Sequence, residues 1–269
     1  MRPRRSGDAC PRLVRALQTS TPLRRALSFT AHAWVLGVAL TAARPATAYC
    51  QKSTCDPEKQ SCRRDEYGCV ASGVGVAWPS LPIPYRFHEA GSSKLADRPL
   101  RSAVRRAFRA WEDVRCPGGP TSLAFAEGDD VDVTLTKEEP AETNFGIYFR
   151  DRGWPGSSST LAITRLDPLP HTGVIVGANI EVNTAGKSFR LSDEDAGDYD
   201  LEAVITHEVG HYLGLDHSTA PGSLMAERYC EGREACAGDA VRALGADDIA
   251  AVCRLYPPGG SEALAERVA

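Results

Sequence analysis

One run of the sequence fixes both a local structure and a chemistry: residues 207–217 read His-Glu-Val-Gly-His-Tyr-Leu-Gly-Leu-Asp-His. Residues four apart share one face of an α-helix, so His207 and His211 can both reach a zinc ion at about 2.0–2.1 Å. Gly214 is expected to end the helix, because glycine turns the chain sharply without a Cβ penalty. That turn would bring His217 round as a third ligand. Three protein ligands leave one position open, which is typical of a catalytic zinc site.

Glu208 follows the first of these histidines, where its carboxylate can take a proton from a water that the metal activates. His-Glu-x-x-His alone is a weak signal, but the added glycine and third histidine make the extended motif specific. The alternative is a helix whose histidines are solvated or buried and bind no metal. We interpret the motif as a hydrolytic zinc site with Glu208 as general base.

The extended motif resembles the metzincin signature, and Ser218 after the third histidine resembles the matrixin branch of that group. Residues 200–204 lead into the helix as in matrixins, and Met225 stands where the family places a structural methionine beneath the zinc. Residues 244–257 are similar to the family's last helix. The resemblance covers roughly residues 82–257. It implies an α+β metzincin fold: a twisted, mostly parallel sheet with an antiparallel edge strand, an active-site helix, a Met-turn and a C-terminal helix.

Some features depart from the family pattern. Glu227 stands where matrixins usually have a proline after the Met-turn methionine. Beyond residue 48, only His88 and His171 lie outside the motif, too few for the structural zinc site of vertebrate members. No cysteine switch precedes the domain, and no hemopexin-like repeats follow it. The chain therefore resembles a compact bacterial matrixin-like enzyme more than an animal matrix metalloprotease.

The resemblance implies a zinc endopeptidase that acts on protein or peptide substrates. We expect it to be a monomer that is secreted to the extracellular space or the periplasm. By resemblance, residues 161–164 form the edge strand of the cleft, where Leu161 and Ala162 would bind an extended peptide as an added strand. The alternative is an ordinary strand of the sheet. A rival function is a catalytically silent binding protein on the metzincin scaffold, with the cysteine-bearing N-terminal segment as an adhesive or inhibitory module.

Calcium is a candidate second cation, because many matrixins require it. Acidic residues gather just before the active-site helix and could bind it: Asp193, Glu194, Asp195, Asp198 and Asp200. A solvated acidic loop is the alternative, because acidic runs usually face water.

Residues 1–48 are typical of an export signal, with eight arginines, one acidic residue and an apolar stretch at about 31–42. Ala46-Thr47-Ala48 offers the cleavage site, and the apolar stretch is too short to predict a membrane span in the mature form. Cleavage there removes those nine charged residues and takes the formal charge from −4 to about −11. That balance argues against nucleic acid and anionic membranes as partners.

Eight cysteines remain after cleavage, an even number that predicts up to four disulfides in an exported chain. Locality favours bonds within residues 50–69 and a bridge among Cys230, Cys236 and Cys253, with a zinc knot as the alternative for the first four cysteines. We expect a cysteine-bearing extension at 49–79, a catalytic domain at 80–258 and a flexible tail at 259–269. The extension could instead be a propeptide.

Periodicity predicts the remaining elements. Apolar residues at helical spacing predict a helix over 98–115, and Phe108 and Trp111 are interpreted as core residues of it. Strands are expected at 83–87, 122–126, 131–137, 145–150, 161–164 and 173–183. Tyr229 lies four residues after Met225, and we favour a packing role over contact with the zinc.

Overall fold

The computed structural model describes residues 48–134, 144–230 and 236–260, all within one compact unit, Pro45–Ala269. The expected signal segment lies outside the described residues except for Ala48, and so does the tail beyond residue 260. Of the strand expected at 131–137, only the first four residues are described, and Val131 forms an isolated bridge to His88. Within these ranges, no helix combines the length and the apolar character that crossing a bilayer requires.

A five-stranded mixed sheet forms the base of the fold, in the order β4-β1-β5-β7-β6. The strands are β1 (Ile83–Phe87), β4 (Phe125–Glu127), β5 (Gly146–Phe149), β6 (Ala162–Pro168) and β7 (Ile175–Val182). The pairs β1·β4, β1·β5 and β5·β7 are parallel, whereas β6 pairs with β7 antiparallel. The expected α+β class is confirmed, and so is the expected antiparallel edge strand.

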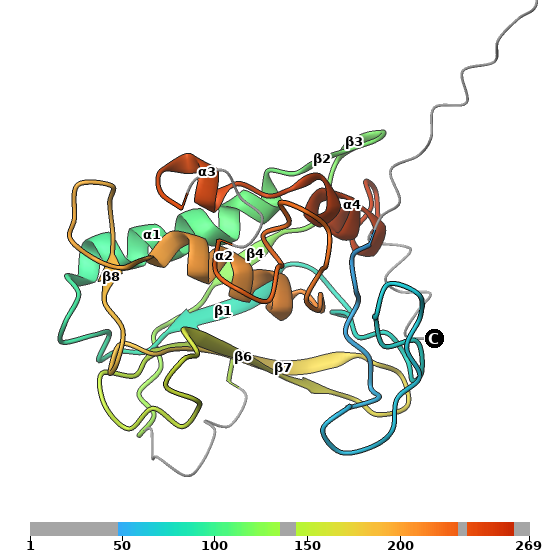
Figure 1. The fold of residues 1–269 in the computed structure, drawn as a ribbon, viewed down its shortest axis with the longest axis horizontal. Helices are drawn as coiled ribbons and strands as arrows, with labels where there is room; N and C mark the ends of the chain where they lie inside the picture. The colour runs from blue at the N-terminus through green and yellow to red at the C-terminus, as the bar shows by residue number, and fades with distance from the viewer. Residues whose placement is uncertain (1–47, 135–143, 231–235, 261–269) are drawn as a thin grey trace, which may run out of the picture. The chain divides into compact units, whose positions relative to one another are not determined.

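Two long helices, α1 (Asp97–Glu112) and α2 (Leu201–Tyr212), lie on the same face of this sheet (Figure 1). The predicted helix 98–115 is confirmed but ends three residues early, because Arg115–Cys116 forms β2 and pairs antiparallel with β3 (Gly119–Pro120). Shorter elements complete the fold: β8 (Phe189–Arg190), β9 (Tyr199–Asp200), α3 (Asp239–Arg242) and α4 (Ala246–Leu255).

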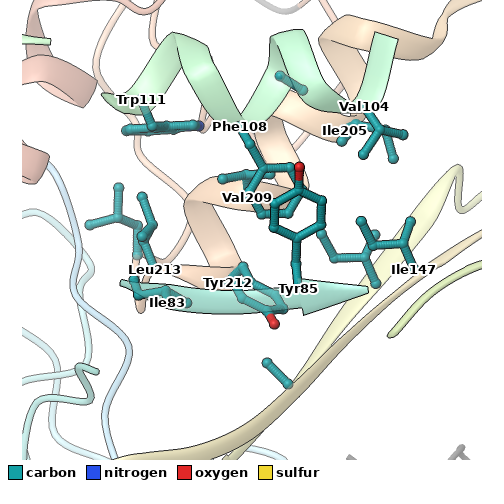
Figure 2. Close-up of a cluster of buried hydrophobic side chains, with 14 of the residues drawn as sticks. Ile83, Tyr85, Val104, Phe108, Trp111, Ile147, Ile205, Val209, Tyr212 and Leu213 are labelled. Carbon is teal, nitrogen blue, oxygen red and sulfur yellow. The ribbon is translucent and has the colours of Figure 1, made fainter. Parts of the chain in front are cut away.

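The core fills the space between α1, α2 and the sheet (Figure 2). The predicted core residues Phe108 and Trp111 point into it from α1, and both are at most 2 % exposed. Phe108 stacks on Tyr85 of β1 with 4.1 Å between ring centroids. Trp111 donates its Nε1–H to the Thr206 carbonyl of α2 at 2.9 Å, which satisfies the indole in the core. These contacts fix α2 relative to the sheet.

All eight described cysteines are paired: Cys50–Cys69, Cys55–Cys62, Cys116–Cys253 and Cys230–Cys236. The expected local bonds within 50–69 are confirmed, and they leave no thiolate in that segment for a zinc knot. Of the three downstream cysteines, Cys230 and Cys236 pair locally, and Cys253 reaches back 137 positions to Cys116.

Two polar clusters tie the sheet and its loops together. Arg150 and Glu181 form an ion pair at 2.7 Å with side chains only 3 % and 1 % exposed. The carboxylate of Asp151 accepts hydrogen bonds from Ser92, Ser93 and Thr184 at 2.5–2.7 Å. Burial alone would raise the pKa of Asp151, but these bonds outweigh it and lower the pKa below its usual range.

Candidate metal centre and cleft

Helix α2 carries the first two histidines. It begins where the side chain of Asp200 accepts a hydrogen bond from the backbone N–H of Ala203 at 2.9 Å, an N-cap contact. It ends two residues before Gly214, which has a left-handed φ of 97°. A Cβ at position 214 would lie 2.5 Å from the carbonyl oxygen of Val76, so both the backbone and the packing require glycine there. The predicted turn is confirmed.

Beyond this turn, the Nε2 atoms of the three histidines converge. The distance between Nε2 of His207 and His211 is 3.1 Å, and that between Nε2 of His211 and His217 is 3.2 Å. Two nitrogens bound to one zinc ion at about 2.0–2.1 Å in tetrahedral geometry stand roughly 3.3–3.4 Å apart. In the described part of the chain, no other group of three or more His, Cys, Asp or Glu side chains converges in this way. The three Nε2 atoms therefore fit one tetrahedral zinc ion and leave its fourth coordination position open.

The second ring nitrogens set the protonation of this centre. Nδ1 of His207 lies 2.7 Å from the carbonyl oxygen of Leu224, and Nδ1 of His211 lies 2.9 Å from that of Leu215. A carbonyl oxygen only accepts, so each Nδ1 carries the hydrogen and each Nε2 presents a lone pair. Burial lowers the pKa of His211 well below its usual value, and burial together with nearby His207 lowers the pKa of His217 to about 4. Both rings are therefore neutral near pH 7, as metal binding requires.

The Met-turn residue packs directly against α2. Met225 is 2 % exposed, and a Cβ placed on Gly210 would lie only 2.2 Å from its sulfur. Asp248 of α4 holds this turn, because its carboxylate accepts from the backbone N–H of Leu224 at 2.6 Å and from the hydroxyl of Ser223 at 2.5 Å. Sequence reasoning assigned no role to Asp248.

Glu208 is 5 % exposed and lies in the cleft beside the histidines. Burial raises the pKa of Glu208, while His207 and a hydrogen bond from Thr164 act in the opposite direction. The Thr164 hydroxyl on β6 donates to Oε2 of Glu208 at 2.6 Å. Sequence reasoning missed this contact, because nothing in a strand threonine points to a glutamate 44 positions away.

A cleft with a volume of about 840 Å³ opens over the histidines. Leu161 and Ala162 line it where β6 begins, and β6 is the last strand of the sheet. Ser223, Leu224 and residues 226–230 line it from the Met-turn onward. Lys52 and Glu58 of the N-terminal segment line it as well, a contribution that the sequence did not predict.

The Tyr229 hydroxyl is engaged away from the metal centre. It accepts from the backbone N–H of Asp200 at 3.1 Å and from the Arg190 guanidinium at 3.4 Å. Its ring packs edge-on against Tyr199 with 5.3 Å between centroids. This geometry favours the packing role over contact with the zinc.

Acidic residues before α2 form an arginine-centred network. Asp193 and Asp200 each lie 2.7 Å from the Arg242 guanidinium, and Asp195 accepts from two backbone N–H groups of its own loop. Arg242 comes from α3, 42 positions after Asp200, and the sequence gave no sign of the pairing. Calcium stays an expectation from the family, because the carboxylates of Asp193 and Asp200 already pair with the Arg242 guanidinium.

The N-terminal segment packs against the turn that carries His217. The backbone N–H of Lys52 donates to the carbonyl of Gly214 at 2.8 Å, and the N–H of Asp216 donates to the carbonyl of Cys50 at 2.8 Å. The Lys52 ammonium also lies 3.5 Å from the Asp216 carboxylate. Residues 50–52 therefore support the loop of the third histidine through an isolated antiparallel bridge between Gln51 and Leu215.

A family model described as Matrixin matches residues 77–257. Matrix metalloproteinase-C of Caenorhabditis elegans is 28% identical over 184 residues, which cover 68% of this chain and 29% of the relative. Human matrix metalloproteinase-15 is 33% identical over 129 residues, 47% of this chain and 18% of the relative. Matrix metalloproteinase-18 of Xenopus laevis is 29% identical over 169 residues, 61% of this chain and 30% of the relative. The chain thus spans less than a third of each relative, all three are animal proteins, and the bacterial source stays a prediction.

Proposed function

Because the chain belongs to the matrixin family, we propose that it is a zinc-dependent endopeptidase. His207, His211 and His217 would hold the metal. The convergence of their three Nε2 atoms carries this proposal, together with the two Nδ1 atoms that are bound to backbone carbonyls. Histidines that were merely buried would not be expected to bring three Nε2 atoms to one point.

Glu208 is the proposed general base. Bound at this centre, zinc would polarise the substrate carbonyl and make an attacking water acidic near neutral pH. Glu208 takes the proton of that water as it attacks the peptide carbon, and then gives a proton to the leaving amine. Its side chain is only 5 % exposed, so little bulk water competes for this exchange.

We propose that a protein or peptide substrate lies extended along β6. This strand ends the sheet, so peptide groups of a substrate can pair with it as an added strand beside Leu161 and Ala162. The acidic mature chain is a poor partner for nucleic acid or for an anionic membrane. Export after cleavage near Ala48, to the periplasm or the extracellular space, and a monomeric state complete the proposal.

We propose further that segment 49–79 belongs to the mature enzyme and is not a removable propeptide. Its removal would leave the Gly214 carbonyl and the Asp216 N–H without their partners, next to the third histidine. It would also expose the backbone carbonyl of Tyr212, which accepts from the Trp78 indole at 2.7 Å. N-terminal sequencing of the exported protein should give Tyr49 as the first residue, and a start beyond residue 79 would refute this part.

Cleavage of denatured casein by the purified protein tests the activity. We expect cleavage that stops when 1,10-phenanthroline removes the metal and returns when zinc is added back. Cleavage that persists at saturating chelator would contradict the zinc mechanism. Bound zinc without any cleavage would favour the catalytically silent binding protein.

A further inference from the structure

Thr164 connects the edge strand of the cleft to the proposed general base. Its hydroxyl oxygen lies 2.6 Å from Oε2 of Glu208 and 3.0 Å from the backbone carbonyl oxygen of the same residue. In the part of the chain that the structure describes, no other side chain donates a hydrogen bond to this carboxylate. Because Glu208 is almost fully buried, a single donor has a large influence on where its carboxylate lies.

The position of that hydroxyl is set by the sheet. Thr164 pairs with Ile180 of β7 inside a continuous antiparallel ladder, so the backbone of β6 cannot shift along its neighbour at this point. Side chains alternate along a strand, and the flanking Arg165 bonds to Glu181 instead of α2. Thr164 thus presents its side chain to the active-site helix.

We propose that Thr164 is a positioning residue for Glu208, an inference that rests on the proposed function. A hydroxyl has one hydrogen, and an ionised carboxylate only accepts. The bond from Thr164 occupies Oε2, and Oε1 is left to exchange the proton with the attacking water. When Glu208 carries that proton, the Thr164 hydroxyl can turn its hydrogen to the Glu208 carbonyl, so it keeps a partner throughout the cycle.

A purely structural role is the competing explanation, since the same hydroxyl also joins β6 to the backbone of α2. Thr164→Val keeps the shape of the side chain and removes the hydroxyl, whereas Thr164→Ser keeps the hydroxyl. A suitable probe is a quenched-fluorescence peptide built on a cleavage site mapped in casein. General acid–base catalysis contributes about 10²- to 10⁴-fold to a rate, and a misplaced base forfeits part of it. We expect Thr164→Val to lower kcat by roughly 10-fold or more with KM within about twofold, and Thr164→Ser to stay within about threefold of wild type.

Thr121→Val is the matched control. Thr121 is a buried threonine whose hydroxyl donates to the Tyr256 carbonyl at 2.6 Å, away from the cleft, so its loss should reduce stability and leave kcat unchanged. On a Glu208→Gln background, Thr164→Val should cause no further loss, because the group that it positions is already disabled. An additive loss in the double variant would show that Thr164 does not act through Glu208. Equal losses in Thr164→Val and Thr164→Ser would show that the loss comes from altered packing and not from the hydroxyl, and either result would overturn the proposal.

A crystal structure of zinc-loaded Thr164→Val gives a readout that does not depend on turnover. We expect the Glu208 carboxylate to turn away from its wild-type rotamer in this variant and to keep that rotamer in Thr164→Ser. An unchanged Glu208 rotamer in Thr164→Val would overturn the proposal even if the variant had lost activity. Wild-type activity that Glu208→Gln does not reduce would instead contradict the proposed function, so the two failures are distinguishable.

Discussion

Gly210 is the position where one added methyl group should disturb the active-site helix most. A Cβ there would lie 2.2 Å from the sulfur of Met225 and 2.9 Å from Cζ2 of Trp111. Ordinary contacts between such atoms are about 3.5–4.0 Å, so the sulfur would have to move by roughly 1.5 Å. Both neighbours are at most 2 % exposed, and the Trp111 indole is tied to the Thr206 carbonyl, so neither has space to retreat.

The magnitude follows from two opposing terms. Overpacking a close-packed core costs about 1–3 kcal/mol, and the buried neighbours place Gly210→Ala toward the upper end. Alanine regains about 1 kcal/mol of helix propensity over glycine. The free energy of unfolding should therefore fall by about 1–2 kcal/mol, which at an m-value of about 2 kcal/mol/M lowers the urea midpoint by roughly 0.5–1 M.

Urea unfolding at a fixed zinc concentration measures this change. Gly186→Ala is the matched control, because its Cβ would meet nothing nearer than 3.8 Å, and it should shift stability by no more than about 0.5 kcal/mol. Met225→Ala should relieve the clash, so Gly210→Ala should cost about 1–2 kcal/mol less on that background than alone. A Gly210→Ala variant as stable as wild type, or strictly additive effects, would refute the reasoning.

Three further predictions concern stability. Glu181→Gln removes the carboxylate that neutralises Arg150 in the core and should lower the free energy of unfolding by about 3–5 kcal/mol in denaturant titrations. Serine at both Cys116 and Cys253 opens the bridge that spans 137 positions, and loop-closure entropy predicts a loss of about 5 kcal/mol, measurable as a lower Tm without reductant. Asp151→Asn should be destabilised at pH 7. The lowered pKa of Asp151 supplies stability that is present above about pH 4 and lost as pH falls through the folded-state pKa. In samples from which a chelator has removed the metal, the difference in free energy of unfolding between Asp151→Asn and wild type should therefore shrink at lower pH. A difference that stays constant with pH would contradict the pKa shift.

Local patterns were sufficient to predict the convergence of the three histidines and the main elements. The spacing of His207 and His211 on one helix face and the turn at Gly214 depend only on residues within eleven positions of one another. They could therefore be predicted from the sequence alone. The helix with Phe108 and Trp111 facing inward follows from the same periodicity. Strand ends were less accurate, because pairing with a neighbour decides where a strand stops. Pairing with β7 carries β6 on to Pro168, four residues past the expected 161–164.

Contacts between distant segments were not predictable in this way. Thr164 bonds to Glu208, Asp248 to the Met-turn, Arg242 to Asp200, and residues 50–52 to the loop of His217. In each case, the partners lie on different elements, and neither carries a local signal for the other. The fold brings them together, and the second layer of the site could be assigned only from the structure.

The central claim is that three histidines hold one zinc ion and that Glu208 transfers the proton. Wild type and Glu208→Gln should be compared in parallel, with zinc counted by elemental analysis and casein cleavage followed in the same samples. We predict one zinc ion per chain in both proteins and cleavage by wild type alone. Equal cleavage by both proteins would contradict the role of Glu208, and a wild type without zinc would contradict the metal centre.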